Sequence, residues 1–254
     1  MKNIIVKKLF FCPIKSLSFN ESKSFKIISN LGIENDRCIA FTRGLDKNLA
    51  EQFNESKTRN LNSFLTLKNS PFLKKYNFLF DSKNKIIRLY VDKKEIINCD
   101  IENRDNIIKI EKFIENLDKK IKKPIHLIYN KEFPYFDTTP EASVSMINLN
   151  TIRDLENKIK KKINFERFRG NILIDNLNAW QEFEYINKMI NIGEVQFKVD
   201  SKIPRCATTN INPNNYNLDI NLPNTLIKKY GHKDFGVYLI PKNSGFIKVN
   251  DKIF

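Results

Sequence analysis

The chain has 254 residues, of which 41% are hydrophobic and 29% are charged, a balance that is typical of a folded protein and not of a disordered one. Its formal net charge is +15, but the lysines are spread among Asn and Ile along the whole chain, with no basic helix and no RNA-binding aromatic signature, so a nucleic-acid binder is not favoured. A basic exterior would still attract an anionic ligand or an acidic partner protein. No apolar run is long enough to cross a bilayer and no signal-peptide cleavage pattern is present, so we expect a cytoplasmic protein that does not bind membranes.

The first half of the chain is predicted to be rich in strands. Apolar alternation predicts strands in IIVKKLFF, SFKIIS, NSFLTL, YNFLFD, IIRLYVD, KEIINC and PIHLIYN, whereas LDKNLAEQF is expected to form a turn or two of helix. Residues 104–120 form the clearest helix, because Ile107, Ile110, Ile114 and Leu117 recur on one face. This helix, or the strand after it, is expected to link a domain of residues 1–120 to a second domain of residues 121–254.

The second half combines strands with two short helices. A helix is expected to start near Thr151, which forms a capping box with Asp154, and another in NTLIKKYG, with Gly231 as its C-cap. NILID, GVYLI and FIKVN are predicted strands, and INIGEVQFKVD is a predicted hairpin that turns at Gly193. The whole chain is therefore expected to be a β-rich α+β protein.

The cysteines do not form a metal or disulfide pattern. They are widely separated in the sequence and contain no CxxC: Cys12, Cys38, Cys99 and Cys206. This spacing argues against a disulfide framework and against a zinc site, and the two histidines, His126 and His232, are too far apart in the sequence to suggest another metal site. An iron–sulfur cluster and a haem are not expected, and there is no glycine fingerprint for a flavin or nicotinamide.

Four polar clusters follow predicted strands or precede predicted helices, where free backbone amides can bind anions. They are CPIKS, the Asp36-Arg37 pair, MINLNT and RFRGN. Together their Lys, Ser, Arg and Asn side chains would make a phosphate cradle. The stretch IPRCATTNINP adds Cys206. Its local sequence leaves two roles open for this residue, a small buried hydrophobe or a thiolate ligand, and the adjacent arginine would favour the thiolate if its side chain turned inward.

In their order and spacing, PIKS, NDR, SVSMINLNTIRDLE, RFRGNILID, AWQEF and IPRCATTNINP resemble the motifs of MOSC-domain proteins that carry the MOSC N-terminal β-barrel. This family includes the mitochondrial amidoxime-reducing component and its bacterial relatives. The resemblance covers about residues 6–253 and implies an N-terminal MOSC-type β-barrel packed against a C-terminal MOSC β-barrel with a few helices. This chain departs from the family in having Gly170 where a proline is common and Cys12 where an aromatic residue is common.

The resemblance implies a molybdenum cofactor, in which a pterin carries a dithiolene and a phosphate and one protein cysteine completes the coordination of the metal. Cys206 matches that cysteine, and a thiolate suits a metal that is already held by sulfur. The expected cofactor-binding residues come from both halves of the chain: Lys15, Ser16, Arg37, Asn148, Thr151, Arg169, Asn171, Arg205 and Thr209.

The activity that the resemblance implies is reduction of N-hydroxylated compounds, such as amidoximes and hydroxylamines, by a molybdenum-dependent oxidoreductase. Because the chain shows no second redox centre, the electrons are expected from a separate donor protein of the flavoprotein or ferredoxin type, and a basic surface would suit an acidic donor. The alternative is a molybdenum cofactor or sulfur carrier protein that uses Cys206 as a persulfide acceptor. The sequence leaves open the physiological substrate, the electron donor, the nucleotide form of the cofactor and the oligomeric state.

Overall fold

The computed structural model describes residues 3–54, 60–136 and 142–254, and these residues form two compact units. One unit contains residues 1–11, 19–34 and 138–254, and the other contains residues 12–18 and 35–137. The first 35 or so residues of the chain alternate between the two units, so no single boundary in the sequence separates them. The division into family domains at residue 120 stays a prediction.

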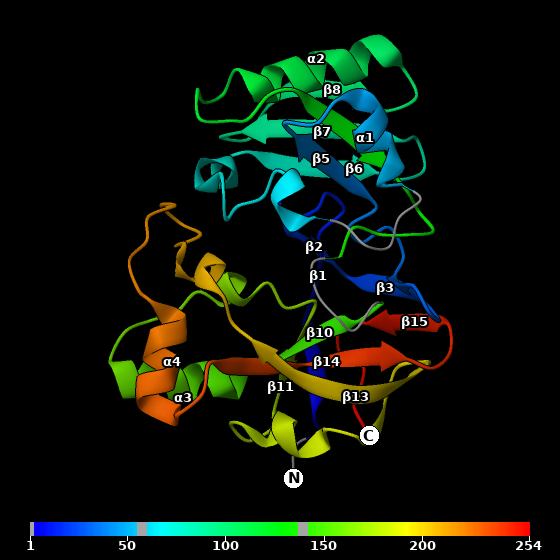
Figure 1. Cartoon of the computed structure of the whole chain (residues 1–254). Coiled ribbons are helices and arrows are strands. Elements are labelled where there is room, and N and C mark those ends of the chain that lie inside the picture. Colours follow the sequence, from blue (N-terminus) through cyan, green and yellow to red (C-terminus); the bar gives the residue numbers. More distant parts are fainter. Residues whose placement is uncertain (1–2, 55–59, 137–141) are drawn as a thin grey trace. The chain divides into compact units, whose positions relative to one another are not determined.

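The unit that holds the C-terminus is built on a sheet of seven strands, shown in the lower part of Figure 1. In sheet order these strands are β12 (Met189–Ile192), β13 (Val195–Pro204), β14 (Asp234–Pro241), β10 (Val144–Asn148), β11 (Ile172–Asp175), β1 (Ile5–Phe11) and β2 (Asn20–Ser22). All neighbours pair antiparallel except β10 and β11, which are parallel. A smaller sheet holds β15 (Gly245–Lys248), β3 (Ser24–Ile28) and β4 (Gly32–Ile33).

The last residues of the chain close the large sheet on itself. Lys252 pairs with Ile5 at the start of β1, and the next residue, Ile253, pairs with Ile192 at the end of β12. The inward side chains of the strands form one apolar core inside this closed sheet, for example Val6, Met146, Ile172, Phe197 and Leu239. Strand alternation alone produces this arrangement, because every second residue of each strand points to the same face. The β-rich fold predicted for this half is therefore confirmed.

Two helices cover part of the outer face of the sheet: α3 (Leu149–Ile159) and α4 (Leu222–Tyr230). Their buried residues Ile152, Leu155, Leu222 and Leu226 pack with outward side chains of β10, β11 and β14 in a second apolar cluster. Figure 1 shows the two helices side by side. Gly231 caps α4 at a φ of 78°, as predicted.

The first of these helices begins earlier than predicted. Asn148 is its N-cap, and the side chain of Asn148 accepts a hydrogen bond from the backbone N–H of Asn150. Thr151 therefore lies within the first turn, where its buried side chain contacts another part of the chain instead of capping. Asparagine and threonine are both good N-caps, so a helix could begin after Asn148 or after Thr151. In the structure it begins after Asn148, and the Thr151 hydroxyl binds Glu182 instead.

The other unit contains two small antiparallel sheets and one long helix. The strands are β5 (Ile39–Arg43) paired with β9 (Ile125–Tyr129), and β6 (Asn77–Asp81), β7 (Ile86–Val91) and β8 (Lys94–Asp100) in that order. The helices are α1 (Lys47–Gln52) and α2 (Arg104–Glu115), with short 3-10 turns η1 (Leu61–Ser63) and η2 (Pro71–Lys75). Ile110 and Ile114 form the buried face of α2, which lies beside β8 (Figure 1).

Two predictions in this unit need correction. The strand expected in NSFLTL (residues 62–67) does not form: its first two residues end the 3-10 turn η1, Phe64 makes an isolated bridge to Thr42, and the remainder is irregular. The helix expected to reach residue 120 ends at Glu115, because Asn116 caps it and residues 117–124 form turns before β9. Cys12, Cys38 and Cys99 are buried, as expected for packing residues. Within residues 3–54, 60–136 and 142–254, no helix is both long and apolar enough to span a membrane.

Candidate functional site around Cys206

Cys206 lies where β13 ends and the 3-10 turn η5 (Ala207–Asn210) begins. It is the one exposed cysteine, and its thiol is free. Its carbonyl accepts hydrogen bonds from the backbone N–H of Thr209 at 3.1 Å and from the hydroxyl of Thr209 at 2.8 Å. Thr209 therefore fixes the turn that presents the thiol. Of the two roles that the sequence left open for Cys206, the buried hydrophobe does not fit this position.

Arg205 turns its side chain into the protein. Its Nε donates to the carbonyl of Phe235 at 2.9 Å, and its Nη1 donates to the carbonyl of Phe168 at 2.7 Å. Nη2 also donates to the carbonyl of Phe235. Burial lowers the pKa of the Arg205 guanidinium to about 10, which leaves it charged at neutral pH. The residue before Cys206 therefore carries a buried positive charge, and its guanidinium N–H groups bind backbone carbonyls of the segments around Phe168 and Phe235.

A second buried arginine holds the far side of the Cys206 loop. Arg167 donates from Nη1 to the carbonyls of Thr209 and Asn210, at 3.4 and 3.0 Å, and from Nη2 to Asp219 at 2.5 Å. Asp219 also binds Lys161 at 3.3 Å. Burial opposes ionisation of Asp219, but these hydrogen bonds and charges outweigh it and lower its pKa. Arg167 and Asp219 thus anchor residues 206–219 to the segment before β11.

The RFRGN motif supplies two different kinds of side chain. Asn171 is buried, and its side chain accepts from the N–H and the hydroxyl of Ser145 while it donates to the carbonyl of Phe10. Arg169 has a left-handed backbone, with φ of 48°, and its half-buried guanidinium lies 5.2 Å from the centre of the Phe19 ring. Asn171 therefore ties three strands together, whereas Arg169 lies partly open to solvent.

Asn148 and Thr151 form a separate network with a residue that sequence reasoning missed. The carboxylate of Glu182 is fully buried and accepts from the Thr151 hydroxyl at 2.8 Å and from Asn148 Nδ2 at 3.0 Å. Burial raises the pKa of Glu182, and the hydrogen bonds from Asn148 and Thr151 partly offset this shift. Glu182 lies inside the AWQEF motif, which carries part of the family resemblance.

The same loop carries an aromatic cluster. Trp180 donates from its ring N–H to Asp154 at 2.8 Å, and the Tyr230 hydroxyl donates to the same carboxylate oxygen at 2.8 Å. The ring of His232 lies against Trp180, with 5.6 Å between ring centres. Nδ1 of His232 accepts from the N–H of Asp234, so the ring has a structural role in this turn.

The three site residues predicted in the N-terminal half all lie in the other unit. Lys15 is buried, donates to the carbonyl of Tyr135 at 2.8 Å and lies over the Phe64 ring. The Tyr135 N–H in turn donates to the carbonyl of Arg37, so Lys15 and Arg37 are close. Arg37 pairs with the buried carboxylate of Asp36, a residue of the NDR motif, and the Ser16 hydroxyl accepts from Leu67.

The structure thus gathers the predicted site residues into three groups. One is Lys15, Ser16 and Arg37; one is Asn148 and Thr151; and one is Arg169, Asn171, Arg205, Cys206 and Thr209. In the part of the chain that the structure describes, no three His, Cys, Asp or Glu side chains gather as metal ligands. The chemistry of Cys206 fits a metal that brings other ligands with it, because an exposed thiol is a single soft donor. The cofactor-binding roles stay predictions.

Residues 135–254 match the family model of the MOSC domain. This match, over slightly less than half of the chain, agrees with the resemblance given by the sequence motifs. The matched region contains Cys206 and the loop that presents it.

Curated relatives belong to two groups. The mitochondrial amidoxime reducing component 2 of Rattus norvegicus is 26% identical over 148 residues, which cover 54% of this chain and 42% of the relative. The mitochondrial amidoxime-reducing component 1 of Homo sapiens is 27% identical over 48% of this chain and 39% of its own length. A molybdenum cofactor sulfurase of Drosophila pseudoobscura pseudoobscura is 30% identical over 100 residues, or 39% of this chain and 12% of the relative. The chain therefore spans about two fifths or less of the length of these relatives.

Among solved structures, the YUAD protein from Bacillus subtilis aligns with 99% of this chain and 94% of its own, at 10% identity and a TM-score of 0.48.

Proposed function

We propose that this protein binds a molybdenum–pterin cofactor and reduces N-hydroxylated compounds with electrons from a separate donor protein. The observation that carries the proposal is the exposed Cys206 thiol, in the region that matches the MOSC domain and on a loop that two buried arginines hold in place. The similarity to amidoxime reducing components supports the choice of substrate class. The overall conversion is R–NHOH + 2 e⁻ + 2 H⁺ → R–NH₂ + H₂O, so an external electron source is required.

Within this proposal, the cofactor supplies the redox chemistry and the chain supplies the ligand and the electrostatics. Cys206 would hold the metal through its sulfur, and the half-exposed guanidinium of Arg169 would bind the anionic part of the pterin. Arg205 and Thr209 act through the fold, because their donors bind backbone carbonyls and fix the position of Cys206. Roles for Lys15, Ser16, Arg37, Asn148, Thr151 and Asn171 in holding the cofactor belong to the same proposal.

The test is a Cys206→Ser variant made in a host that produces the cofactor. The exposed position predicts little change in folding, since a serine there meets no tight packing. We expect molybdenum retention to fall and reduction of benzamidoxime by chemically reduced protein to be lost, with an unchanged thermal midpoint. The matched control is Cys99→Ser, in which a buried cysteine is replaced; it should keep both metal and turnover after correction for its stability. Full turnover in the Cys206→Ser variant would reject the ligand role.

A second candidate is a sulfur carrier, which the similarity to molybdenum cofactor sulfurases favours. Here the exposed Cys206 thiol would attack the persulfide of a donor, R–S–SH + Cys–SH → R–SH + Cys–S–SH, with no net oxidation. Purified protein separates the two functions. Molybdenum at one atom per chain with turnover supports the reductase, whereas a metal-free protein whose Cys206 accepts sulfur, seen as a mass increase of one sulfur atom, supports the carrier.

A further inference from the structure

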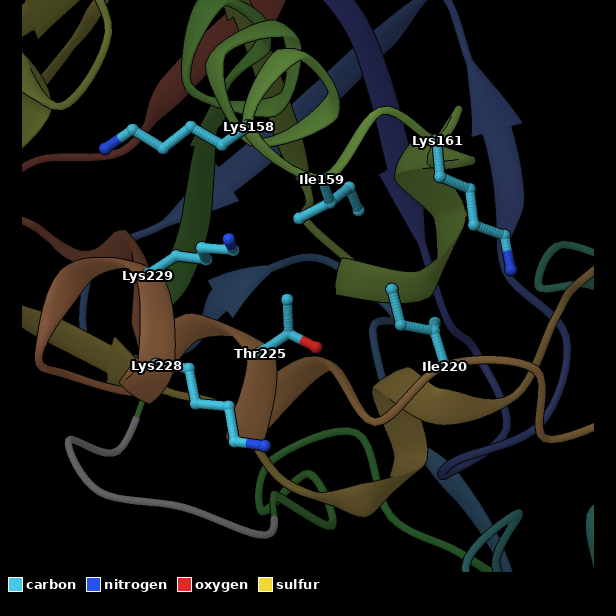
Figure 2. A pocket seen from close by; sticks show the side chains of 7 residues that line it. All are labelled: Lys158, Ile159, Lys161, Ile220, Thr225, Lys228 and Lys229. Carbon is cyan, nitrogen blue, oxygen red and sulfur yellow. The ribbon is translucent and has the colours of Figure 1, made fainter.

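A pocket separate from the Cys206 loop lies between α3 and α4 in the unit that holds the C-terminus. Its volume is about 300 Å³, which is at the lower end of the range for small-molecule sites. Four lysines, two isoleucines and one threonine line it: Lys158, Ile159, Lys161, Ile220, Thr225, Lys228 and Lys229. Figure 2 shows Ile159, Ile220 and Thr225 around the hollow, with the lysines at its edges.

The positive charge at this pocket is only partly compensated. Lys161 is paired with Asp219 at 3.3 Å, and the ammonium of Lys158 lies 4.1 Å from the centre of the Tyr230 ring. Among the described residues, no carboxylate lies within ion-pair distance of Lys158, Lys228 or Lys229. The charge of Lys158 also interacts with the carboxylate of Asp154, whose pKa is lowered, after an opposing effect of burial, by hydrogen bonds from Trp180 and Tyr230 and by the charge of Lys158. The neighbouring ammonium groups of Lys228 and Lys229 repel each other, and an anion bound there would relieve that repulsion.

Helix termini explain part of this arrangement. Lys158 lies in the last turn of α3, and Lys228 and Lys229 lie in the last turn of α4, where cations are stabilised by the helix dipole. That effect acts on each helix separately. It does not account for two helix ends that share one hollow, nor for apolar side chains of Ile159 and Ile220 at its lining.

We propose that this pocket binds a small phosphate ester with an apolar body. The apolar body would contact Ile159 and Ile220, the Thr225 hydroxyl offers a hydrogen bond, and the phosphate would pair with the ammonium groups of Lys228 and Lys229. A dianionic phosphate matches the two ammonium groups of Lys228 and Lys229 better than a single carboxylate does. The assignment is independent of the molybdenum chemistry, because it uses none of the residues that hold Cys206 in place.

Phenyl phosphate is the probe, with inorganic phosphate, benzoate and benzyl alcohol as its partial analogues. Titrations at about 0.1 M salt are followed by the δ1-methyl NMR signals of isoleucine, with Ile159 and Ile220 assigned from Ile159→Val and Ile220→Val variants. We expect phenyl phosphate to shift these two signals and to bind more tightly than all three analogues. Benzoate that binds equally well, or shifts confined to other isoleucines, would overturn the proposal.

Charge reversal tests the lysines. Lys228→Glu/Lys229→Glu should weaken phenyl phosphate binding by about tenfold or more, since two attractive charges become repulsive. The matched control, Lys242→Glu/Lys248→Glu, changes the net charge equally at two exposed lysines outside the pocket and should leave affinity within about twofold. Equal losses in both variants would show nonspecific attraction and reject the site. If the reversal variant does not fold, Lys228→Gln/Lys229→Gln should still weaken binding several-fold, and unchanged affinity there would reject it too.

Discussion

Replacing Glu182 with glutamine tests whether a buried carboxylate organises the start of α3. The wild-type carboxylate accepts from two buried donors, Thr151 Oγ1 and Asn148 Nδ2. Glutamine has nearly the same size but only one acceptor oxygen. At the Oε2 position that oxygen still lies 3.0 Å from both donors, but the amide NH₂ then faces the Thr151 hydroxyl; at the Oε1 position it leaves Asn148 Nδ2 without an acceptor. An unsatisfied buried donor costs about 1–3 kcal/mol. The substitution also removes the cost of burying a negative charge, which opposes this loss.

The balance between these effects depends on pH. Burial raises the pKa of Glu182 in the folded state above its ordinary value of 4.5, so the folded protein binds the proton more tightly than the unfolded chain does. Wild-type stability from this group is therefore fully present below pH 4.5 and decreases as pH rises through the folded-state pKa. Each unit by which the pKa is raised corresponds to about 1.4 kcal/mol. Because glutamine does not titrate, the stability deficit of Glu182→Gln should be greatest near pH 5 and smallest near pH 8.

Urea unfolding at several pH values measures this deficit. The single tryptophan, Trp180, lies on the same loop as Glu182 and reports on unfolding of this unit. Glu182→Ala is the control: it also lacks the titration but removes both acceptors and opens a cavity, so its deficit should be larger by about 1–3 kcal/mol with the same trend. A deficit of Glu182→Gln that stays constant between pH 5 and 8, or grows with pH, would refute the raised pKa.

Two further substitutions test how the Cys206 region is held. A methyl group added at Gly170 would lie 2.2 Å from Ile147 Cγ1, so Gly170→Ala should lower the free energy of unfolding by about 1–3 kcal/mol. Combining it with Ile147→Ala should cost less than the sum of the single changes, measured by a double-mutant cycle; strict additivity would contradict the contact. Asp219→Asn should lower stability at pH 7 by about 1–3 kcal/mol, because buried Arg167 loses its counter-charge. The pKa of Asp219 is lowered in the folded protein, so the stability that Asp219 contributes is present above pH 3.8 and is lost as pH falls through the folded-state pKa. The free energies of unfolding of the wild type and of Asp219→Asn should therefore become equal in acid. A difference in stability that persists there would exclude the ion pair as its cause.

Local signals in the sequence predicted much of the fold. The hairpin at Gly193 and the C-cap at Gly231 both depend on residues within a few positions, and both glycines adopt positive φ. Local signals did not predict that the large sheet closes on itself. This closure depends on Ile253 pairing with Ile192, and neither end of that contact carries a local pattern. The start of α3 was misplaced for the same reason, because the contact that buries Thr151 comes from a distant loop.

Sequence reasoning singled out Cys206 together with Arg205 and Thr209, but it did not recognise which acidic residues are buried. The motif resemblance singled out this cysteine, and the structure exposes its thiol. Asp36 was named only as part of a polar pair and Glu182 was not named, because single acidic residues in NDR and AWQEF have no spacing that distinguishes a buried carboxylate from a solvated one. Burial is a property of the assembled fold, and only their hydrogen-bond partners reveal it.

The arginines near Cys206 differ in burial and in their hydrogen-bond partners. Arg205 and Arg167 are buried, and both donate to backbone carbonyls of neighbouring segments. Removing either leaves carbonyls without donors, so we expect such changes to displace the loop and to act on Cys206 through its position. Arg169 differs because its guanidinium is half-buried on a left-handed residue beside the Phe19 ring. Of the three, Arg169 is therefore the one whose side chain is most accessible to an anion from solvent.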